Sequence, residues 1–556
     1  MFRKRTFSER IWESIPGFQF WLVFFGAVTL SRVQPVWASI FIICFDLYWV
    51  LKALNVASHL MVSYGKFKIF VTIDWLDYVK RLKSPNDFLN YLENKSGGKL
   101  AAAEKKYIKE ELTRLNKIFN KLPGDREYIN YYHVVLVPFV DESFEVLDST
   151  LSAIAASNYP KEQIIIVLAG EERAGTEALK IGHQIKEKYE KLFFQFYTTI
   201  HPDGLPDEIK GKSANASYAI RTVRPWLHEL GIGDKQVLVS NFDSDTIIHP
   251  QYFARVMYEF LTAEFPYQSS YQPIAIYNNN IWDSPAIIRV VSVSNSFWQF
   301  TESSRPDRLR TFSSHTMTLQ ALVEVGFWKK DIVNEDGYIY WQCYLHYKSK
   351  YYVIPLFIPI SLDTCLAATT WQTLKNQYKQ KRRWAYNVEY YPHLIPKLLK
   401  LDAPKFDKFY KIFQYAEGNF NWATASIMIS MLGWLPLFIG GTQFQNSVLA
   451  FNLPFATKVL MTIATGFLIF SVYINMVLLP PRPKKYGVIR SVMMYLQWFL
   501  VPLASVIFGS LPAIEAQTRL MFGKYLEFWV TPKARKGENT GLDMKEMKLI
   551  NSKPVQ

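Results

Sequence analysis

Residues 236–245 read Gln-Val-Leu-Val-Ser-Asn-Phe-Asp-Ser-Asp, an apolar run that ends in two acids separated by one residue. The run predicts a buried strand, and Asp243 and Asp245 then stand at its carboxyl end, where open α/β sheets bind their ligands. Carboxylate oxygens suit hard cations, so the pair predicts a Mg²⁺ or Mn²⁺ site that faces a diphosphate. The alternative is a turn in which both aspartates hydrogen-bond their own backbone.

Two similar runs precede this stretch and indicate an α/β domain. Residues 133–138 and 163–168 are apolar on both faces, as buried parallel strands are. Residues 145–157, between them, have helical periodicity. Short strands that alternate with helices predict an α/β domain, here over residues 131–400.

Apolar runs on both sides of this domain predict a membrane protein. Two runs precede the domain and three follow it, and each approaches or exceeds the length that crosses about 30 Å of hydrocarbon; they cover residues 16–29, 35–54, 422–440, 455–479 and 488–511. Arginine and lysine flank the first two runs, so the positive-inside rule places the amino terminus and the domain in the cytoplasm, in a multi-pass protein of the plasma or inner membrane. Basic residues near a membrane also explain the net charge of +15, and without a recognisable nucleic-acid module no nucleic-acid partner is expected.

Composition divides the chain into five parts. These are two transmembrane helices over 1–65, a charged helical linker or collar over 66–130, the α/β domain over 131–400, interface helices with carboxyl-terminal transmembrane or re-entrant segments over 401–525, and a motif with a polar tail over 526–556. Pro502, Gly509 and Pro512 interrupt the last apolar run, and polar residues follow it. We therefore predict that this run enters the membrane, turns in non-helical backbone and returns, which leaves the carboxyl terminus in the cytoplasm.

Two further motifs offer groups for catalysis and for sugar binding. Asn334-Glu335-Asp336 supplies carboxylates, one of which could act as a general base; the alternative is an acidic first turn of a helix. Gln380, Arg383 and Trp384 fall at positions i, i+3 and i+4 of a predicted helix and so share one face. They offer an amide, a cation and an indole, although an Arg/Trp cluster at a membrane interface would have the same composition.

In their order along the chain, these motifs resemble those of the membrane-integrated family 2 glycosyltransferases, which include the cellulose, chitin and hyaluronan synthases. Asp243-Ser244-Asp245 is similar to the D-x-D of that family, Asn334-Glu335-Asp336 to its T-E-D, and residues 380–384 to its Q-x-x-R-W. Three further stretches extend the resemblance over residues 131–535: Val137 to Glu142 (V-P-x-x-x-E), Gly211 to Asn215 (K-x-G-N) and Phe528 to Lys533 (F-x-V-T-x-K, the motif of a gating loop).

The resemblance implies a nucleotide-sugar domain of the GT-A type, inserted between amino- and carboxyl-terminal transmembrane helices. It implies an inverting, processive hexosyl transfer that extends a β-linked polysaccharide from a UDP-sugar and couples synthesis to translocation across the membrane. The expected partners are the nucleotide-sugar donor, the growing glycan acceptor and the lipid bilayer, with accessory export subunits or further copies of the chain as possible additions.

The resemblance also implies roles for individual residues. Asp336, with Glu335 beside it, matches the catalytic base, and Asp243 and Asp245 match the metal ligands. The implied nucleotide-sugar contacts are Pro138, Glu142, Glu171, Lys212 and Asp243; the acceptor and diphosphate contacts are Gln380, Arg383, Trp384 and His315; and the gating loop contains Phe528, Val530, Thr531 and Lys533.

One departure from the family pattern leaves the nucleotide base open. Residues 168–173, Leu-Ala-Gly-Glu-Glu-Arg, replace a step that resembles D-D-G-S in the family, so Glu171 would contact the base with a longer side chain. Lys212 could instead be a solvated lysine, and His315 a structural histidine. Two other functions are alternatives: a transferase that adds one sugar to a polyprenyl-phosphate or another lipid acceptor, and an inactive translocation or scaffold subunit. The Q-x-x-R-W and gating motifs count against the first, and the intact carboxylates count against the second.

Overall fold

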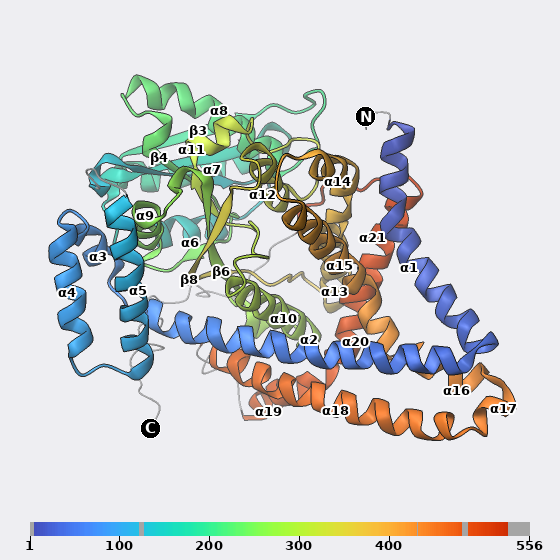
Figure 1. Cartoon of the computed structure of the whole chain (residues 1–556). Coiled ribbons are helices and arrows are strands. Elements are labelled where there is room, and N and C mark those ends of the chain that lie inside the picture. The colour runs from blue at the N-terminus through green and yellow to red at the C-terminus, as the bar shows by residue number, and fades with distance from the viewer. Residues whose placement is uncertain (1–4, 122–126, 431, 481–487, 532–556) are drawn as a thin grey trace. The chain divides into compact units, whose positions relative to one another are not determined.

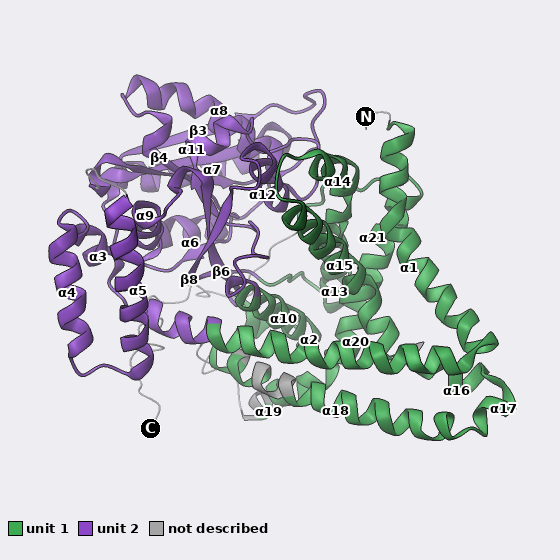
Figure 2. Ribbon diagram, in the orientation of Figure 1, with its two compact units in different colours: residues 1–62, 280–301, 364–540 green, residues 63–279, 302–363, 541–556 purple. Residues whose placement is uncertain are grey.

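The computed structural model describes residues 5–121, 127–430, 432–480 and 488–531. The chain forms two compact units (Figure 2). Among the described residues, unit 1 consists of those within 5–62, 280–301 and 364–531, and unit 2 of those within 63–279 and 302–363. Each unit therefore combines stretches that are distant in the sequence.

Within the described residues, unit 2 contains an eight-stranded sheet in the order β3-β2-β1-β4-β7-β6-β8-β5 (Figure 1). Its strands are β1 Tyr132–Pro138, β2 Ile164–Glu171, β3 Gln195–His201, β4 Val237–Asn241, β5 Ile247–Ile248, β6 Ser269–Tyr277, β7 Thr316–Thr318 and β8 Tyr352–Leu362. Strands β1 to β4 are parallel, β6 is parallel to β8, and β5 and β7 run antiparallel to their neighbours. The three apolar runs that predict buried strands are β1, β2 and β4, so the predicted α/β domain is confirmed.

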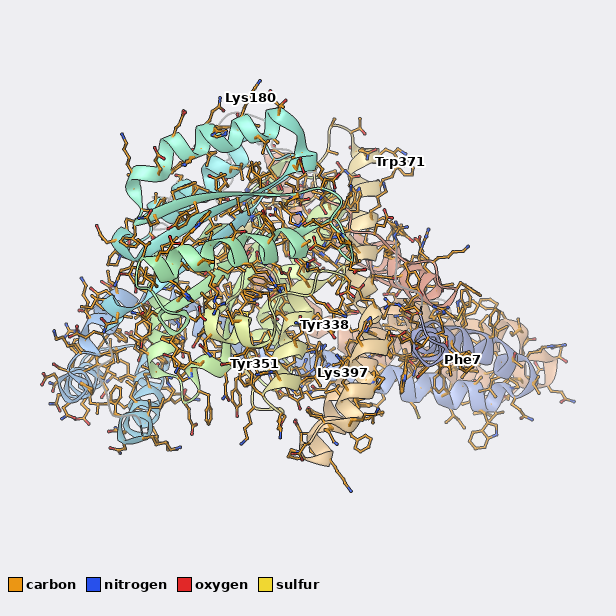
Figure 3. The ribbon with its side chains drawn as sticks, turned by 90° about the horizontal axis from the view of Figure 1, so that it is seen from above. Phe7, Lys180, Tyr338, Tyr351, Trp371 and Lys397 are labelled. Atoms are coloured by element: carbon orange, nitrogen blue, oxygen red, sulfur yellow. The ribbon has the colours of Figure 1, made fainter. Side chains whose placement is uncertain are left out.

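Helices cover the two faces of this sheet. They include α6 Phe144–Ala155, α7 Gly175–Tyr189, α8 Lys212–Glu229, α9 Tyr252–Thr262, α11 Leu319–Glu324 and α12 Glu335–His346. Because crossovers between parallel strands are right-handed, α6 and α7 share one face of the sheet and α8 covers the other. The outer sides of the helices are polar, and Lys180 of α7 points away from the sheet (Figure 3). The loops after β1, β2 and β4 lie at the edge where open α/β sheets bind their ligands.

The charged segment before the sheet is a packed part of unit 2. It forms α3 Trp75–Arg81, α4 Pro85–Gly97 and α5 Ala102–Lys121. Helix α3 packs on α9, where the Arg255 guanidinium lies 3.9 Å from the centre of the Trp75 ring. Arg114 of α5 donates to the carbonyl oxygen of Thr262 at 3.1 Å. Cation–π and hydrogen-bond contacts thus attach these helices to α9.

Among the described residues, four helices are long and apolar enough to cross a membrane. They are α1 Phe7–Val33, α2 Pro35–Phe70, the Val448–Gly466 part of α18 (Val448–Val477), and the helical run Val492–Met521. Two of them precede the α/β domain and two follow it, which indicates a membrane protein. The predicted placement of an α/β domain between long apolar helices is confirmed.

One predicted span has a different form in the structure. The run 422–440 is not a single α-helix, because α15 (Lys405–Ser430) ends inside it. A 3-10 turn, Leu432–Trp434, and the short helix α16 (Leu435–Ile439) follow. Apolar composition alone predicted one continuous membrane span here, whereas the chain forms the end of α15, a 3-10 turn and a short helix.

The predicted non-helical turn in the last apolar run is wrong. The described chain is helical from Val488 to Met521, through α19 Val488–Leu496, a 3-10 turn Gln497–Leu500, α20 Val501–Ser505, a π-helical turn Val506–Ser510 and α21 Leu511–Met521. Pro502 and Pro512 lie in the first turns of α20 and α21, where a missing N–H group costs no helical hydrogen bond. Gly509 lies in the π-helical turn. Changes of helix type therefore accommodate residues that predict a break.

The end of this helical run lies beside the start of α1. A Cβ atom added to Gly17 would come 2.9 Å from the Gln517 carbonyl oxygen and 2.9 Å from the Met521 Cβ atom, so the two helices touch at this glycine. Trp21 Nε1 donates to Thr518 Oγ1 at 3.0 Å. The amino-terminal part of α1 and the carboxyl-terminal part of α21 are therefore direct neighbours.

Candidate functional site

Three charged residues meet at the carboxyl edge of the unit 2 sheet. Lys212 begins α8, Asp243 follows β4, and Asp336 lies in the first turn of α12. Lys212 Nζ donates to Asp243 Oδ1 at 2.7 Å and lies 3.8 Å from Asp336 Oδ1. Residues from three separate sequence motifs are thus grouped around one ammonium group.

Two opposing effects determine the charge of this lysine. Its side chain is 12% exposed, and burial disfavours the ammonium form. The carboxylates of Asp243, Asp336 and Glu335 outweigh burial and raise the pKa of Lys212 above its ordinary value. Lys212 is therefore positively charged at neutral pH and suited to binding anionic oxygen atoms.

Asp245 and Glu142 fix the loop that follows β4. Asp245 is 2% exposed, and its Oδ2 atom accepts the backbone N–H of Asp363 at 2.8 Å. Glu142 accepts from the Ser244 hydroxyl group and from the Val140 N–H, each at 2.7 Å. Both oxygens of Glu142 thus have protein partners, one of them in the D-x-D loop, and its predicted nucleotide contact stays a prediction.

A loop of small residues supports Asp243 from the strand next to β4. Ser313 donates its hydroxyl hydrogen to Asp243 Oδ2, and the Asp243 N–H donates to Ser314 Oγ at 3.3 Å. His315 follows in the same loop, with its Nδ1 atom 2.8 Å from the Phe312 carbonyl oxygen. Burial lowers the pKa of His315, so its ring is neutral at pH 7. Its predicted contact with the acceptor stays a prediction.

A pocket lies at the carboxyl ends of β2 and β3. Its lining includes Glu171, the last residue of β2, and His201, the last residue of β3. Glu171 accepts from Arg173 Nε, and His201 Nε2 lies 2.9 Å from Glu208 Oε2. Pro138 ends the neighbouring strand β1. The predicted nucleotide contact Glu171 therefore faces a recess that is lined by both donors and acceptors.

In unit 1, two of the predicted motifs contact each other. Helix α13 (Thr370–Ala385) carries the Q-x-x-R-W residues. Gln380 Nε2 donates to Thr531 Oγ1 at 3.4 Å, although the two residues are 151 positions apart. The Arg383 guanidinium lies 4.7 Å from the centre of the Phe528 ring, at cation–π distance. The segment with the F-x-V-T residues thus lies against the motif face of α13.

The indole of Trp384 has a cationic neighbour on the same helix. Lys381 Nζ lies 5.1 Å from the centre of the Trp384 ring and donates to Asn295. Burial lowers the pKa of Lys381 to about 8. Val530 is half-buried in the segment that crosses α13, and Lys533 lies outside the described residues.

Residues 238–508 match the model of a protein family described as glycosyl transferase family group 2. The chain carries a glycosyltransferase family 2 domain. The α/β domain, over about residues 130–400, is of the GT-A type that the motifs imply. Glycosyl transfer is therefore the chemistry that this match indicates for the domain. A comparison with curated proteins finds no match.

Solved structures of glycosyltransferases are similar to the chain. The mannosyltransferase PcManGT from Pyrobaculum calidifontis, in complex with GDP-Man and Mn²⁺, is 14% identical, with a TM-score of 0.35, and 74% of this chain and 98% of that chain are covered. S. aureus TarS 1-349 is 12% identical, with a TM-score of 0.33 and coverage of 71% and 92%. The same TarS fragment in complex with UDP-GlcNAc is 12% identical, with a TM-score of 0.32 and coverage of 71% and 93%.

The family 2 domain offers two carboxylates to a divalent cation. Asp243 and Asp245 belong to one loop and present only oxygen atoms, the donors that hard cations prefer. Within the described part of the chain, no group of three or more His, Cys, Asp or Glu side chains is arranged to hold a metal ion. Mg²⁺ usually takes one or two carboxylates and completes its coordination with phosphate oxygens and water. The pair therefore fits a cation that binds together with a diphosphate.

Proposed function

We propose that the family 2 domain is an inverting, processive transferase that extends a β-linked glycan from a UDP-linked sugar. The observation that carries the proposal is the grouping of Lys212, Asp243 and Asp336 at the carboxyl edge of the sheet. A base, a cationic group and a candidate metal ligand are the groups that displacement of a nucleoside diphosphate requires. The intact carboxylates also favour an enzyme over an inactive scaffold subunit.

In this proposal Asp336 is the general base. Its carboxylate takes the proton of the acceptor hydroxyl group while that oxygen attacks the anomeric carbon and the bond from this carbon to the diphosphate breaks. A single displacement of this kind inverts the configuration at the anomeric carbon. Lys212, whose Nζ lies 3.8 Å from Asp336 Oδ1, places a positive charge beside the base that attracts the leaving diphosphate. Asp243 and Asp245 would hold a divalent cation, which when bound offsets the charge of the leaving group.

We assign the nucleotide base to the pocket that Glu171 lines. The pocket lies at the ends of β2 and β3, on the edge where open α/β sheets bind nucleotides. Glu171 and Glu208 offer acceptors to the base, and Arg173 and His201 offer donors. His201 and Arg173 had no role in the sequence-based prediction, so they extend the predicted nucleotide contacts.

We assign the acceptor glycan to the motif face of α13. The indole of Trp384 can stack on the C–H face of a sugar ring, and Arg383 can bind the diphosphate as it leaves. The segment Phe528–Thr531 would act as a lid over the loaded site, as closing loops do in many transferases. Its contacts with Gln380 and Arg383 support a common task for the two motifs.

We propose a cytoplasmic orientation for the amino terminus, the family 2 domain and this lid segment. Basic residues precede α1, so the positive-inside rule places the start of that helix in the cytoplasm. Arg10 Nη2 donates to the Met521 carbonyl oxygen at 2.7 Å, so the chain leaves α21 at the same end of α1. The predicted cytoplasmic carboxyl terminus thus keeps its support, although the non-helical turn invoked for it is wrong.

The proposed function is tested with the purified full chain in lipid nanodiscs. We expect Mn²⁺-dependent incorporation of label from one member of a panel of radiolabelled nucleotide sugars, and a ladder of products on a gel. Transfer of a single sugar to added polyprenyl phosphate would contradict processive synthesis and support the single-addition alternative. Absence of transfer from every donor, in protein that binds a nucleoside diphosphate with Mn²⁺, would contradict catalysis altogether.

A replacement at Trp384 tests the acceptor assignment. We expect Trp384→Ala to shorten the product, while the KM for the nucleotide sugar changes by less than about threefold, because the variant loses the aromatic face assigned to the acceptor and no group assigned to the donor. Gel analysis gives the product length, and release of the nucleoside diphosphate gives the KM. Trp371→Ala is the matched control, since Trp371 lies in the same helix and is 66% exposed. A product of normal length together with a raised donor KM would move the indole to the donor site.

A further inference from the structure

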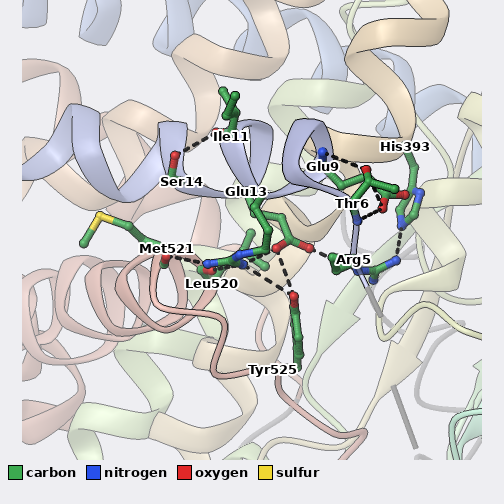
Figure 4. A network of polar contacts seen from close by, with 11 residues as sticks. Arg5, Thr6, Glu9, Ile11, Glu13, Ser14, His393, Leu520, Met521 and Tyr525 are labelled. Carbon is green, nitrogen blue, oxygen red and sulfur yellow. Dashed lines mark hydrogen bonds and ion pairs between the residues drawn. The ribbon is translucent and has the colours of Figure 1, made fainter. Parts of the chain in front are cut away.

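A network of charged residues connects the start of α1 to the segment that follows α21 (Figure 4). We call residues Phe522 to Thr531 the strap, since they lead from the end of α21 to α13. At the beginning of the strap, Gly523 adopts a φ of 69°, which favours glycine, and a Cβ atom there would come 3.4 Å from the Arg10 guanidinium. The chain therefore leaves α21 in a turn that closely borders a residue of α1.

Glu13 is the centre of this network. The residue is 1% exposed, and its carboxylate accepts from the Tyr525 hydroxyl group at 3.0 Å and from Arg10. Arg5 Nε lies 3.2 Å from the other carboxylate oxygen. A buried carboxylate is stable only with such partners, so the three side chains hold one another in place.

Arg10 joins this centre to the end of α21. Its guanidinium donates to the carbonyl oxygens of Leu520 at 3.1 Å and Met521 at 2.7 Å. The last carbonyl groups of a helix have no partner within the helix, and a cation at this end also interacts favourably with the helix dipole. Arg10 therefore satisfies the end of α21 while it pairs with Glu13, and the two helix ends are fixed to each other.

The two ends of the strap are held with different strength. At Tyr525 the strap is bonded to a buried carboxylate, and hydrogen bonds to charged groups are among the strong ones. At its other end the contacts with α13 include a hydrogen bond of 3.4 Å to Gln380 and the cation–π contacts of Arg383 with Phe528 and of Lys379 with Trp529, none of which involves a carboxylate. The end at α13 should therefore open first, while the end at α1 stays in place.

We infer that Glu13, Arg10 and Tyr525 form the fixed hinge of the strap, and that Glu13 is a positioning residue for Phe528–Thr531. Tyr525 precedes Phe528 by three residues, which can span at most about 10 Å, so fixing Tyr525 restricts where Phe528 can lie. Neither Glu13 nor Tyr525 lies within residues 238–508, the part that matches the family model. The effect of this hinge on catalysis rests on the proposed lid function, but the hinge itself does not.

The position of the strap is measured without substrate, by the rate at which a maleimide labels Val530→Cys. The exposed Cys44 is replaced by serine in every protein that is labelled. Cys343 and Cys365 are buried, and their slow reaction with the maleimide gives the background labelling rate. We expect Glu13→Gln to accelerate labelling about tenfold, the order by which a hydrogen bond to a charged group shifts a population. Glu9→Gln is the matched control, with the same change of charge one turn earlier in α1 and contacts to Thr6.

Tyr525→Phe provides a second variant that removes a single hydroxyl group and keeps the ring. It should accelerate labelling in the same direction, and it decides the question if Glu13→Gln is not recovered as folded protein. Unchanged labelling in the recovered variants would overturn the hinge. The hinge would also be overturned if Glu9→Gln accelerated labelling as much as Glu13→Gln does.

Turnover, measured with Val530 intact, separates the hinge from the lid. We expect kcat of Glu13→Gln to fall about tenfold, in step with the faster labelling, because gating segments often limit turnover. Faster labelling with unchanged kcat would leave the hinge in place and overturn the proposed lid function. A lower kcat with unchanged labelling would overturn the hinge, because Glu13 would then act on the reaction by another route.

Discussion

The replacement Asp336→Asn is expected to reduce transfer by about 10²–10⁴-fold, the contribution that a positioned general base makes. Asparagine has the same size as aspartate but cannot take the proton of the acceptor hydroxyl group at neutral pH. Lys212 retains its ion pair with Asp243 at 2.7 Å, so the nucleotide and the cation should still bind. Initial rates of label incorporation measure the first effect, and calorimetric titration with UDP and Mn²⁺ measures the second.

The matched control for this replacement is Asp331→Asn. Asp331 is exposed, lies five residues before Asp336 and pairs with Lys329 at 3.4 Å, outside the group around Lys212. It should retain nearly full activity. Turnover of Asp336→Asn close to that of the unaltered enzyme would mean that another group is the base, and buried Glu335 would be the next residue to replace.

The strands at the site could be predicted because their signal is local. Residues 133–138, 163–168 and 237–241 are continuous apolar runs, and each one is a buried parallel strand in the structure. Ligand positions follow from the topology, since the residues just after such strands gather at one edge of the sheet. This is why the sequence alone predicts Asp243 at the ligand-binding edge of the sheet.

Contacts between distant side chains could not be predicted in the same way. The bond of Glu142 to Ser244 joins residues 102 positions apart, and the support of Asp243 by Ser313 spans 70 positions. A serine in a polar loop carries no pattern that names its partner. Sequence reasoning named Glu142 as a nucleotide contact, which stays a prediction, and it did not reveal the bond of Glu142 to Ser244 in the D-x-D loop.

Proline and glycine misled the prediction for the last membrane segment. A proline in the interior of an α-helix breaks it, because the proline lacks an N–H group. Pro502 and Pro512, however, each lie in the first turn of a new helical segment, where no N–H group is needed. The chain shifts to 3-10 and π-helical turns between these segments and remains helical to Met521. Helix propensity gives the free-energy cost of a proline or glycine inside a regular α-helix. It does not predict the 3-10 or π-helical turns that remove this cost.

At the charged start of α1, composition predicts the membrane orientation but not the contacts that these residues make. Arginine residues before an apolar run indicate a cytoplasmic end. They do not reveal that Arg10 and buried Glu13 bind the end of a helix some 510 residues later in the chain. A glutamate within a candidate membrane helix is costly unless it is paired, and its burial at 1% exposure with three partners explains how it is tolerated.

The replacement Asp245→Ala is expected to abolish the effect of Mn²⁺ on nucleotide binding and to reduce transfer by at least about 10²-fold, because the cation carries the charge of the leaving group. In the unaltered protein, Mn²⁺ should tighten UDP binding by roughly tenfold or more, as charged contacts contribute about 1.5–3 kcal/mol. Titrating UDP with and without Mn²⁺ gives this ratio, which should fall to about one in the variant if one shared cation supplies the coupling.

Asp245→Asn separates the loss of the cation from damage to the loop. Asp245 is buried, and its Oδ2 atom accepts the Asp363 N–H at 2.8 Å, so alanine also removes a structural hydrogen bond. The amide oxygen of asparagine can still accept that bond, but a neutral amide binds a hard dication more weakly than a carboxylate does. Both variants should therefore lose the Mn²⁺ effect, and only Asp245→Ala should unfold at lower temperature. If Asp245→Asn kept the full Mn²⁺ effect, the cation would have to be held elsewhere, and Asp245 would serve the fold of the loop alone.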